Sequence, residues 1–298
     1  MTILSFCLAS GAVAAGQDRP PAFRVAASRV SLNVVVKDYR GRAITNLARR
    51  DFQVLDQGRA VAVDDFRTGE ESVSIAILID TSGSMRLGSR PIATRQAVNL
   101  LLAQLRPGDE AAMFTFDTAL CEVVPFATDL ARVQDGLESV APFGSTSLHD
   151  AVAAAARQLN GRASPRRAVI AITDGFDNSS ELSAVAASGI ASSSDVPVYV
   201  LAVANTFFTS PPGVVAIEPV EGGGVARLDE LTAPTGGASF AAETPAEASQ
   251  SVRQILTDLR AGYVLSFTPD ETGGWHPLTV SVSRKNARVR TRAGFWVD

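Results

Sequence analysis

The chain has 298 residues, of which 46% are hydrophobic and 19% are charged, so it can bury a substantial core. Its net charge is −4, and Lys and Arg form no cluster along the sequence. This composition excludes a disordered chain and argues against nucleic acid or an anionic membrane surface as a partner.

The first residues have the features of an export signal. Residues 1–15, MTILSFCLASGAVAA, are apolar and end in small residues of the kind that precede a cleavage point. We predict a signal peptide over residues 1–16, a linker over 17–27, and a periplasmic or extracellular protein. A core helix is the alternative, because the stretch is too short to span a bilayer. No second long apolar run follows, so we expect no transmembrane anchor.

Residues 28–71 show the alternation of β-strands. In RVSLNVVVKD, every second residue from Val30 to Val36 is apolar, and turn candidates follow at YRGR and DQGR. This pattern predicts an N-terminal segment made of strands.

Residues 72–261 then alternate between strands and helices. Apolar strand runs occur at SVSIAILI, EAAMFTF, RRAVIAIT and VPVYVLAVA, and helical spacing occurs between them, as in Leu148, Val152, Ala155 and Leu159. Continuously apolar strands that alternate with helices predict an α/β fold, a doubly wound and mostly parallel sheet covered on both faces. Cys121, in the alternating stretch CEVVPF, is expected to be a small buried hydrophobe.

Residues 262–298 return to strands, and Arg288, Arg290 and Arg292 alternate on what we expect to be a solvent face. In a doubly wound domain the first strand begins, and the last helix ends, at the same edge of the sheet. The segments 28–71 and 262–298 therefore emerge together, and we predict that they pair into one small β module.

Oxygen-bearing side chains follow three of the predicted elements. They are Asp80, Ser82 and Ser84 in DTSGS, Thr146 in GSTSLHD, and Asp174 in ITDG. Sites in open α/β sheets form at the carboxyl ends of strands, so these residues are expected to meet. An all-oxygen set without His or Cys suits Mg²⁺ or Mn²⁺ better than Zn²⁺.

Simpler explanations exist for several of these residues. Asp80 and the hydroxyls could cap the next helix, although three coincident element ends favour a metal site. Asp177 and Asn178 in GFDNSSE could form a second cation site, but a turn and helix cap is the preferred interpretation. We expect His149 to be a surface or rim residue and His276 to be a turn residue beside Trp275.

The order D-x-S-x-S, then Thr in GST, then Asp in TDG resembles the metal-ion-dependent adhesion site of von Willebrand factor A domains, over about two thirds of the chain. The flanking stretches VVVKDYRGRAITNLARRDFQVLDQG and VRTRAGFW resemble exported bacterial proteins described as VWFA-related, notably of acidobacterial type. By this resemblance Ser82, Ser84 and Thr146 are near ligands of one Mg²⁺ or Mn²⁺. Asp80 and Asp174 hold the cation directly or through water.

The resemblance implies a metal-dependent protein-binding or adhesion module that captures an Asp or Glu carboxylate of a protein partner. The predicted rim of the binding site consists of Arg86 and Arg90 after the first loop and Phe207 and Phe208 in the stretch 205–224. A scaffold or regulatory subunit of an envelope complex or of an ATPase is the alternative.

A metal-dependent hydrolase is the less favoured class. The chain has no H-E-x-x-H, no phosphate-binding Gly-rich loop and no G-x-S-x-G elbow. We therefore expect no catalysis. The identity of the partner and the oligomeric state stay open.

Overall fold

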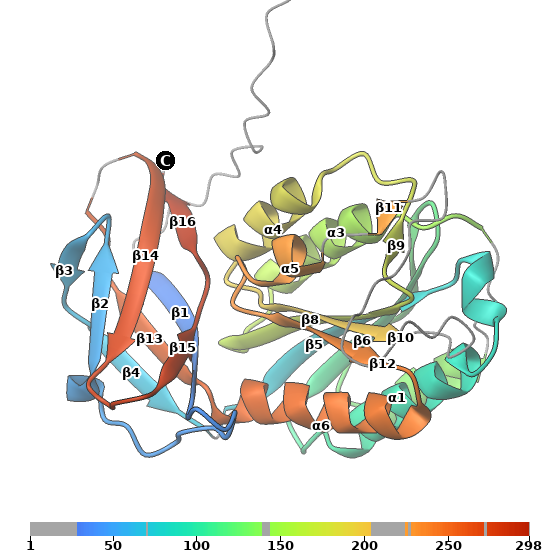
Figure 1. Cartoon of the computed structure of the whole chain (residues 1–298), viewed down its shortest axis with the longest axis horizontal. Helices are drawn as coiled ribbons and strands as arrows, with labels where there is room; N and C mark the ends of the chain where they lie inside the picture. Colours follow the sequence, from blue (N-terminus) through green and yellow to red (C-terminus); the bar gives the residue numbers. More distant parts are fainter. Residues whose placement is uncertain are drawn as a thin grey trace, which may run out of the picture.

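The structure is a computed structural model that describes residues 29–69, 71–138, 144–203, 224–225, 228–270 and 273–297. The predicted signal peptide and linker, and the rim residues Phe207 and Phe208, lie outside these residues. The described chain forms two parts that lie side by side, a sheet flanked by helices and a smaller unit made mainly of strands (Figure 1).

The larger part is built on a six-stranded sheet in the order β12-β10-β8-β5-β6-β7. All pairs are parallel except β6 with β7. All eight residues of the central strand β5 are buried, because helices cover both of its faces. The prediction of a doubly wound, mostly parallel sheet is confirmed. The strands are β5 (Val73–Asp80), β6 (Glu110–Phe116), β7 (Leu120–Ala127), β8 (Arg166–Thr173), β10 (Val198–Val203) and β12 (Ala238–Ala242).

Two groups of helices cover the sheet. One face packs against α1 (Arg90–Ala103), α2 (Leu130–Glu138) and α6 (Pro245–Ala261). The other face packs against α3 (Leu148–Asn160), α4 (Ala184–Ser193) and α5 (Leu228–Thr232). The helical spacing noted in α3 does mark its buried side. Among the described residues, no helix is both long and apolar enough to cross a membrane.

The smaller part, the β module, contains two antiparallel sheets in the orders β15-β1-β13-β4 and β16-β14-β2-β3. Each sheet combines strands from both outer segments of the chain, with Val34 of β1 opposite Tyr263 of β13, for example. The predicted pairing of these segments is confirmed. The strands are β1 (Val30–Lys37), β2 (Phe52–Asp56), β3 (Arg59–Val61), β4 (Asp65–Thr68), β13 (Tyr263–Phe267), β14 (Gly274–Val282), β15 (Arg288–Arg290) and β16 (Gly294–Val297), and the short helix η1 (Arg49–Asp51) precedes β2.

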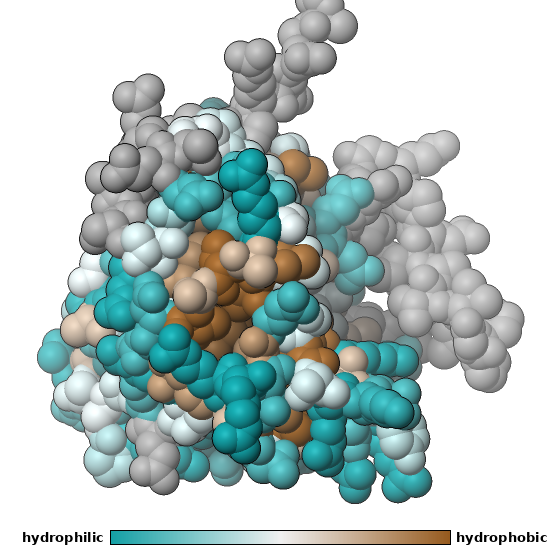
Figure 2. Space-filling view, turned by 90° about the vertical axis from the view of Figure 1, so that its left-hand side faces the viewer, coloured by the Kyte–Doolittle hydropathy of each residue, from teal (hydrophilic) through white to brown (hydrophobic). Residues whose placement is uncertain are grey.

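The two sheets of the β module share one apolar core, to which both contribute buried residues such as Leu32 and Val54. Other apolar residues packed against this core are only partly buried. Figure 2 shows apolar side chains gathered in the middle of the face that the β module turns outward, with hydrophilic side chains around them.

The junction between the two parts is polar and buried. Asp258 of α6 lies 2.7 Å from Lys37 Nζ and accepts hydrogen bonds from Arg290 Nη2 at 2.5 Å and Gln254 Nε2 at 2.9 Å. Arg292 is 4% exposed and donates to main-chain carbonyls of both parts. Charged side chains therefore join the β module to the amino edge of the parallel sheet.

The expectation of a solvent face for Arg288, Arg290 and Arg292 is wrong for two of the three. Arg288 is exposed, but Arg290 and Arg292 lie in the junction. The α/β part covers the Arg290 end of the β15 face that points away from the β-module core, while the Arg288 end remains exposed. Alternation alone cannot distinguish these two environments.

Two further expectations are corrected. His276 is not in a turn: it lies in β14, is 1% exposed and has Nδ1 2.8 Å from Asp56 Oδ1. The strand begins at Gly274, so the ring falls on the inward side of the pleat. Cys121 is not a buried hydrophobe: it lies in β7, the edge strand of the six-stranded sheet, and is exposed.

Candidate functional site

Three loops meet at the carboxyl edge of the parallel sheet, away from the β module. Loop 1 (residues 80–86) follows β5, loop 2 (residues 144–147) precedes α3, and loop 3 (residues 174–182) follows β8, the neighbour of β5. Gly83 N donates to Gly144 O at 3.1 Å, and Asn178 N donates to Thr146 O at 3.0 Å. Main-chain hydrogen bonds therefore join all three loops.

Asp80 is the last residue of β5 and is 1% exposed. Its Oδ1 accepts a hydrogen bond from Ser82 N at 2.8 Å, and its Oδ2 accepts one from Thr173 Oγ1 at 2.5 Å. Burial raises the pKa of Asp80 to about 6, and the nearby carboxylate of Asp174 adds to the rise. Asp80 is therefore a buried carboxyl whose negative charge is poorly compensated.

The hydroxyls of Ser82 and Ser84 lie next to each other in loop 1, with 3.0 Å between their Oγ atoms. Ser82 precedes the short helix η2 (Gly83–Arg86), but its side chain makes no cap hydrogen bond. The N-cap of α1 is Ser89, which also makes none. Helix capping therefore does not explain the polar residues of loop 1.

Thr146 of loop 2 is 2% exposed and is held from both sides by loop 3. Its amide donates to Asn178 Oδ1 at 2.9 Å, and its carbonyl accepts from Asn178 N and Ser179 N, each at 3.0 Å. The backbone on either side of this threonine is thus fixed by the residues that follow Asp174 in the sequence.

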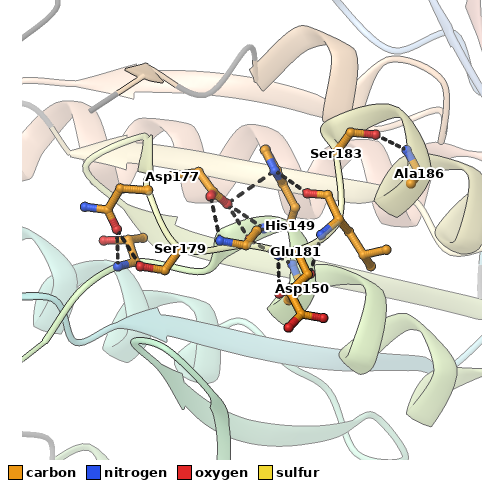
Figure 3. Close-up of polar contacts among 11 residues, drawn as sticks. His149, Asp150, Asp177, Ser179, Glu181, Ser183 and Ala186 are labelled. Carbon is orange, nitrogen blue, oxygen red and sulfur yellow. Dashed lines mark hydrogen bonds and ion pairs between the residues drawn. The ribbon is translucent and has the colours of Figure 1, made fainter. Parts of the chain in front are cut away.

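Loop 3 also caps the helix that follows loop 2 (Figure 3). Asp177 Oδ2 accepts from His149 N at 3.0 Å, and Ser180 Oγ lies 3.1 Å from the same nitrogen. The cap role preferred for the GFDNSSE stretch is therefore present, but it serves α3, whereas Ser183 caps α4 through Ala186 N.

His149 does not lie on the surface as expected. Its side chain is 13% exposed, and Nδ1 lies 3.2 Å from Leu182 O and 3.3 Å from Asp177 Oδ2 (Figure 3). A histidine in the first turn of a helix was expected at the rim, but loop 3 folds over it.

Arg90, the first residue of α1, points into the edge where the loops meet. Its Nη1 donates to Ser84 O at 2.7 Å and to Asp174 Oδ2 at 3.0 Å, and its side chain is 12% exposed. The Asp174 side chain is fully buried. Arg86, by contrast, is exposed. The sequence predicts the same rim position for both arginines, because nothing in MRLGSRP distinguishes an inward from an outward side chain.

The donor set of these loops fits a hard divalent cation. It consists of hydroxyl and carboxylate oxygens, and of the two buried carboxyls, Asp80 accepts hydrogen bonds only from neutral donors in the part of the chain that the structure describes. Across the described ranges, no three His, Cys, Asp or Glu side chains gather as a metal site. A cation at this edge would therefore depend on the hydroxyls of Ser82, Ser84 and Thr146 as well as on carboxylates.

Comparison with known sequences identifies one family. The family described as von Willebrand factor type A domain matches residues 75–176, which include loops 1 and 2 and the start of loop 3. No curated protein matches the sequence significantly.

Solved structures share the fold. An aerotolerance-related membrane protein from Bacteroides fragilis NCTC 9343, with multiple mutations to serines, is 23% identical and has a TM-score of 0.51, covering 62% of this chain and 99% of its own. A von Willebrand factor type A protein from Catenulispora acidiphila is 14% identical and also has a TM-score of 0.51, covering 91% of this chain and 74% of its own. At sequence identities of 23% and 14%, the similarity of these structures to this chain is a similarity of fold. The fold is consistent with the family match, in which residues 75–176 resemble a von Willebrand factor type A domain.

Proposed function

We propose that this protein is a Mg²⁺- or Mn²⁺-dependent protein-binding or adhesion module that captures an Asp or Glu carboxylate of its partner. Domains of this type commonly serve in adhesion or protein binding. The observation that carries the proposal is the hydroxyl pair of Ser82 and Ser84 beside the buried carboxyls of Asp80 and Asp174.

The proposed ligand roles follow from the surroundings of each oxygen. Ser82, Ser84 and Thr146 would offer neutral hydroxyl oxygens, while Asp80 and Asp174 would contribute negative charge directly or through water. A cation held mainly by neutral oxygens keeps positive character and an open position for an outside carboxylate. The chain's own part is to hold the three loops together, through the hydrogen bonds of Gly83 and Asn178.

Calorimetric titration with Mg²⁺ and with Mn²⁺ tests the site. We expect the wild type to bind one equivalent of the cation. The affinity for the cation should fall at least tenfold in Asp80→Ala and in Thr146→Ala, because each variant lacks one proposed ligand. Thr118→Ala is the matched control, since this exposed threonine follows the neighbouring strand β6 and belongs to none of the three loops. A wild-type protein that ignores both metals would overturn the proposal.

The proposed partner class has its own test. Capture of envelope proteins on the immobilised wild type should require Mg²⁺ or Mn²⁺ and should be abolished by EDTA and by Thr146→Ala. Capture that persists in EDTA would favour a metal-independent scaffold or regulatory subunit. We also propose that the protein is exported, on the strength of residues 1–15; sequencing the N-terminus of the mature protein checks this.

A further inference from the structure

Arg90 lies among the proposed ligands with only 12% of its side chain exposed, although charged side chains of this length normally reach further into water. One nitrogen, Nη1, bridges Ser84 O and Asp174 Oδ2. Another, Nε, is buried and has no hydrogen-bond partner among the described residues. A guanidinium held in this way is a fixed positive charge inside the site and has little freedom to follow a partner on the surface.

The net charge of the three loops depends mainly on the charged side chains that are shielded from water. Asp80 and Asp174 are buried carboxyls, and Arg90 is the one cation that contacts either of them among the described residues. Asp117 and Asp177 lie nearby, but their oxygens accept hydrogen bonds from other groups: Asp117 from the amide of Ala119, and Asp177 from the amide of His149 and the hydroxyl of Ser180. With both buried carboxyls ionised, Arg90 leaves the buried group with a single negative charge.

A divalent cation added to this group changes its sign. The loaded site then carries one net positive charge, which a single outside carboxylate neutralises. Without Arg90 the loaded site would already be neutral and would have no electrostatic preference for an anion. Buried charges are screened much less than surface charges, so this single charge has a large effect.

We propose that Arg90 is a specificity-determining residue of the site: its positive charge weakens cation binding and makes the loaded site select a carboxylate over a neutral oxygen ligand. This inference rests on the proposed function, because it requires a cation at the three loops. It makes Arg90 part of the charge balance of the site, in addition to any contact with the partner.

The test separates charge from fold by means of two opposite effects. Arg90→Gln keeps a hydrogen-bond donor and removes the charge, and Arg90→Lys keeps the charge on a different head group. Mn²⁺ affinity is measured by calorimetry. Binding of acetate, and of neutral acetamide as its control, is measured by the broadening of their methyl signals by protein-bound Mn²⁺.

In Arg90→Gln we expect Mn²⁺ to bind on the order of tenfold more tightly and acetate on the order of tenfold more weakly, while acetamide binding is unchanged. Arg90→Lys should stay within about threefold of the wild type for all three probes. The matched control is Arg86→Gln, which removes an exposed charge four residues earlier and should change none of them.

The outcomes distinguish this inference from the proposed function. If the wild type binds no Mn²⁺, the proposed function fails and the inference fails with it. If the wild type binds Mn²⁺ but Arg90→Gln weakens both Mn²⁺ and acetate, or moves neither, Arg90 is only a structural residue and the cation site stands. Should Arg90→Gln fold poorly, Arg90→Met is measured in its place, with the same opposite shifts required.

Discussion

Two buried carboxyls of the α/β part have opposite surroundings. Asp258, on α6 next to the β module, contacts the side-chain nitrogens of Lys37 and Arg290. Asp80, at the other edge of the sheet, accepts hydrogen bonds only from neutral groups among the described residues, the amide of Ser82 and the hydroxyl of Thr173. Both are essentially inaccessible to water. Within the described ranges, two cations thus contact one buried carboxyl and none contacts the other.

This difference separates a structural charge from a functional one. Taking a carboxylate out of water costs several kcal/mol unless a cation or several hydrogen bonds compensate for it. At the junction the compensation comes from the β module, so the charges tie the two parts together. At the three loops the compensation is incomplete, which raises the pKa of Asp80 and favours a cation from outside.

The largest loss of stability is expected when the ion pairs of Asp258 at the junction are removed. Asp258→Ala leaves the partly buried side chains of Lys37 and Arg290, which are 19% and 27% exposed, without their carboxylate, and we expect it to lower the free energy of unfolding by about 3 kcal/mol. Urea denaturation measures the loss. Asp38→Ala is the control, because it removes only the exposed pair with Arg42, which is worth about 1 kcal/mol or less. Equal losses in the two variants would show that the junction charges are not structural.

A medium effect is expected from the pH dependence of Asp80. Its pKa is raised from 3.8 to about 6, so the folded protein holds this proton more tightly than the unfolded chain does. Ionisation of Asp80 therefore lowers stability as the pH rises from 3.8 to about 6. The Asp80→Asn variant has no carboxyl to ionise at this position. Its free energy of unfolding minus that of the wild type should therefore be about 2 kcal/mol higher at pH 7 than at pH 4.5.

Urea denaturation in metal-free buffer at the two pH values measures this difference. Added Mg²⁺ should reduce it, because a bound cation stabilises the ionised Asp80 of the wild type. If the two proteins differ in free energy of unfolding by the same amount at both pH values, the charge of Asp80 is not poorly compensated in the folded protein.

The smallest effect concerns the hydrogen bonds that hold loop 2. Asn178→Ala removes the side-chain acceptor of the Thr146 amide, and we expect it to cost about 1 kcal/mol and to speed hydrogen exchange at that amide. Ser179→Ala is the control, because the main-chain amide of Ser179 still reaches Thr146 O in that variant. Unchanged exchange at Thr146 in Asn178→Ala would mean that loop 3 does not hold loop 2.

The sequence predicted the parts of the molecule that depend on local pattern. Apolar runs that end abruptly at Asp80 and before Asp174 identified neighbouring strands, and the topology of a doubly wound sheet then brought their ends to one edge. The same topology predicted that the outer segments would pair, because the amino edge of the sheet is where both emerge.

What the sequence could not predict depends on contacts between distant segments. Arg290 and Arg292 alternate as exposed residues do, and only the docking of the two parts reveals that Arg292 is buried and that just 27% of the Arg290 side chain is exposed. Arg90 comes shortly after the exposed residues Leu87 and Gly88, and its inward direction results from Asp174, which is distant in sequence. The cap that Asp177 provides to α3 likewise crosses between loops, whereas cap patterns in a sequence are local.

The pairing of the two outer segments has a mechanical consequence. The α/β part is inserted between β4 and β13, while β1 pairs directly with β15, and a short connection leads from β15 to β16. Tension applied between β1 and β16 therefore runs through the β module and bypasses the parallel sheet. The three loops lie outside this load path, so a pull on the outer segments leaves their geometry unstrained until the β module itself gives way.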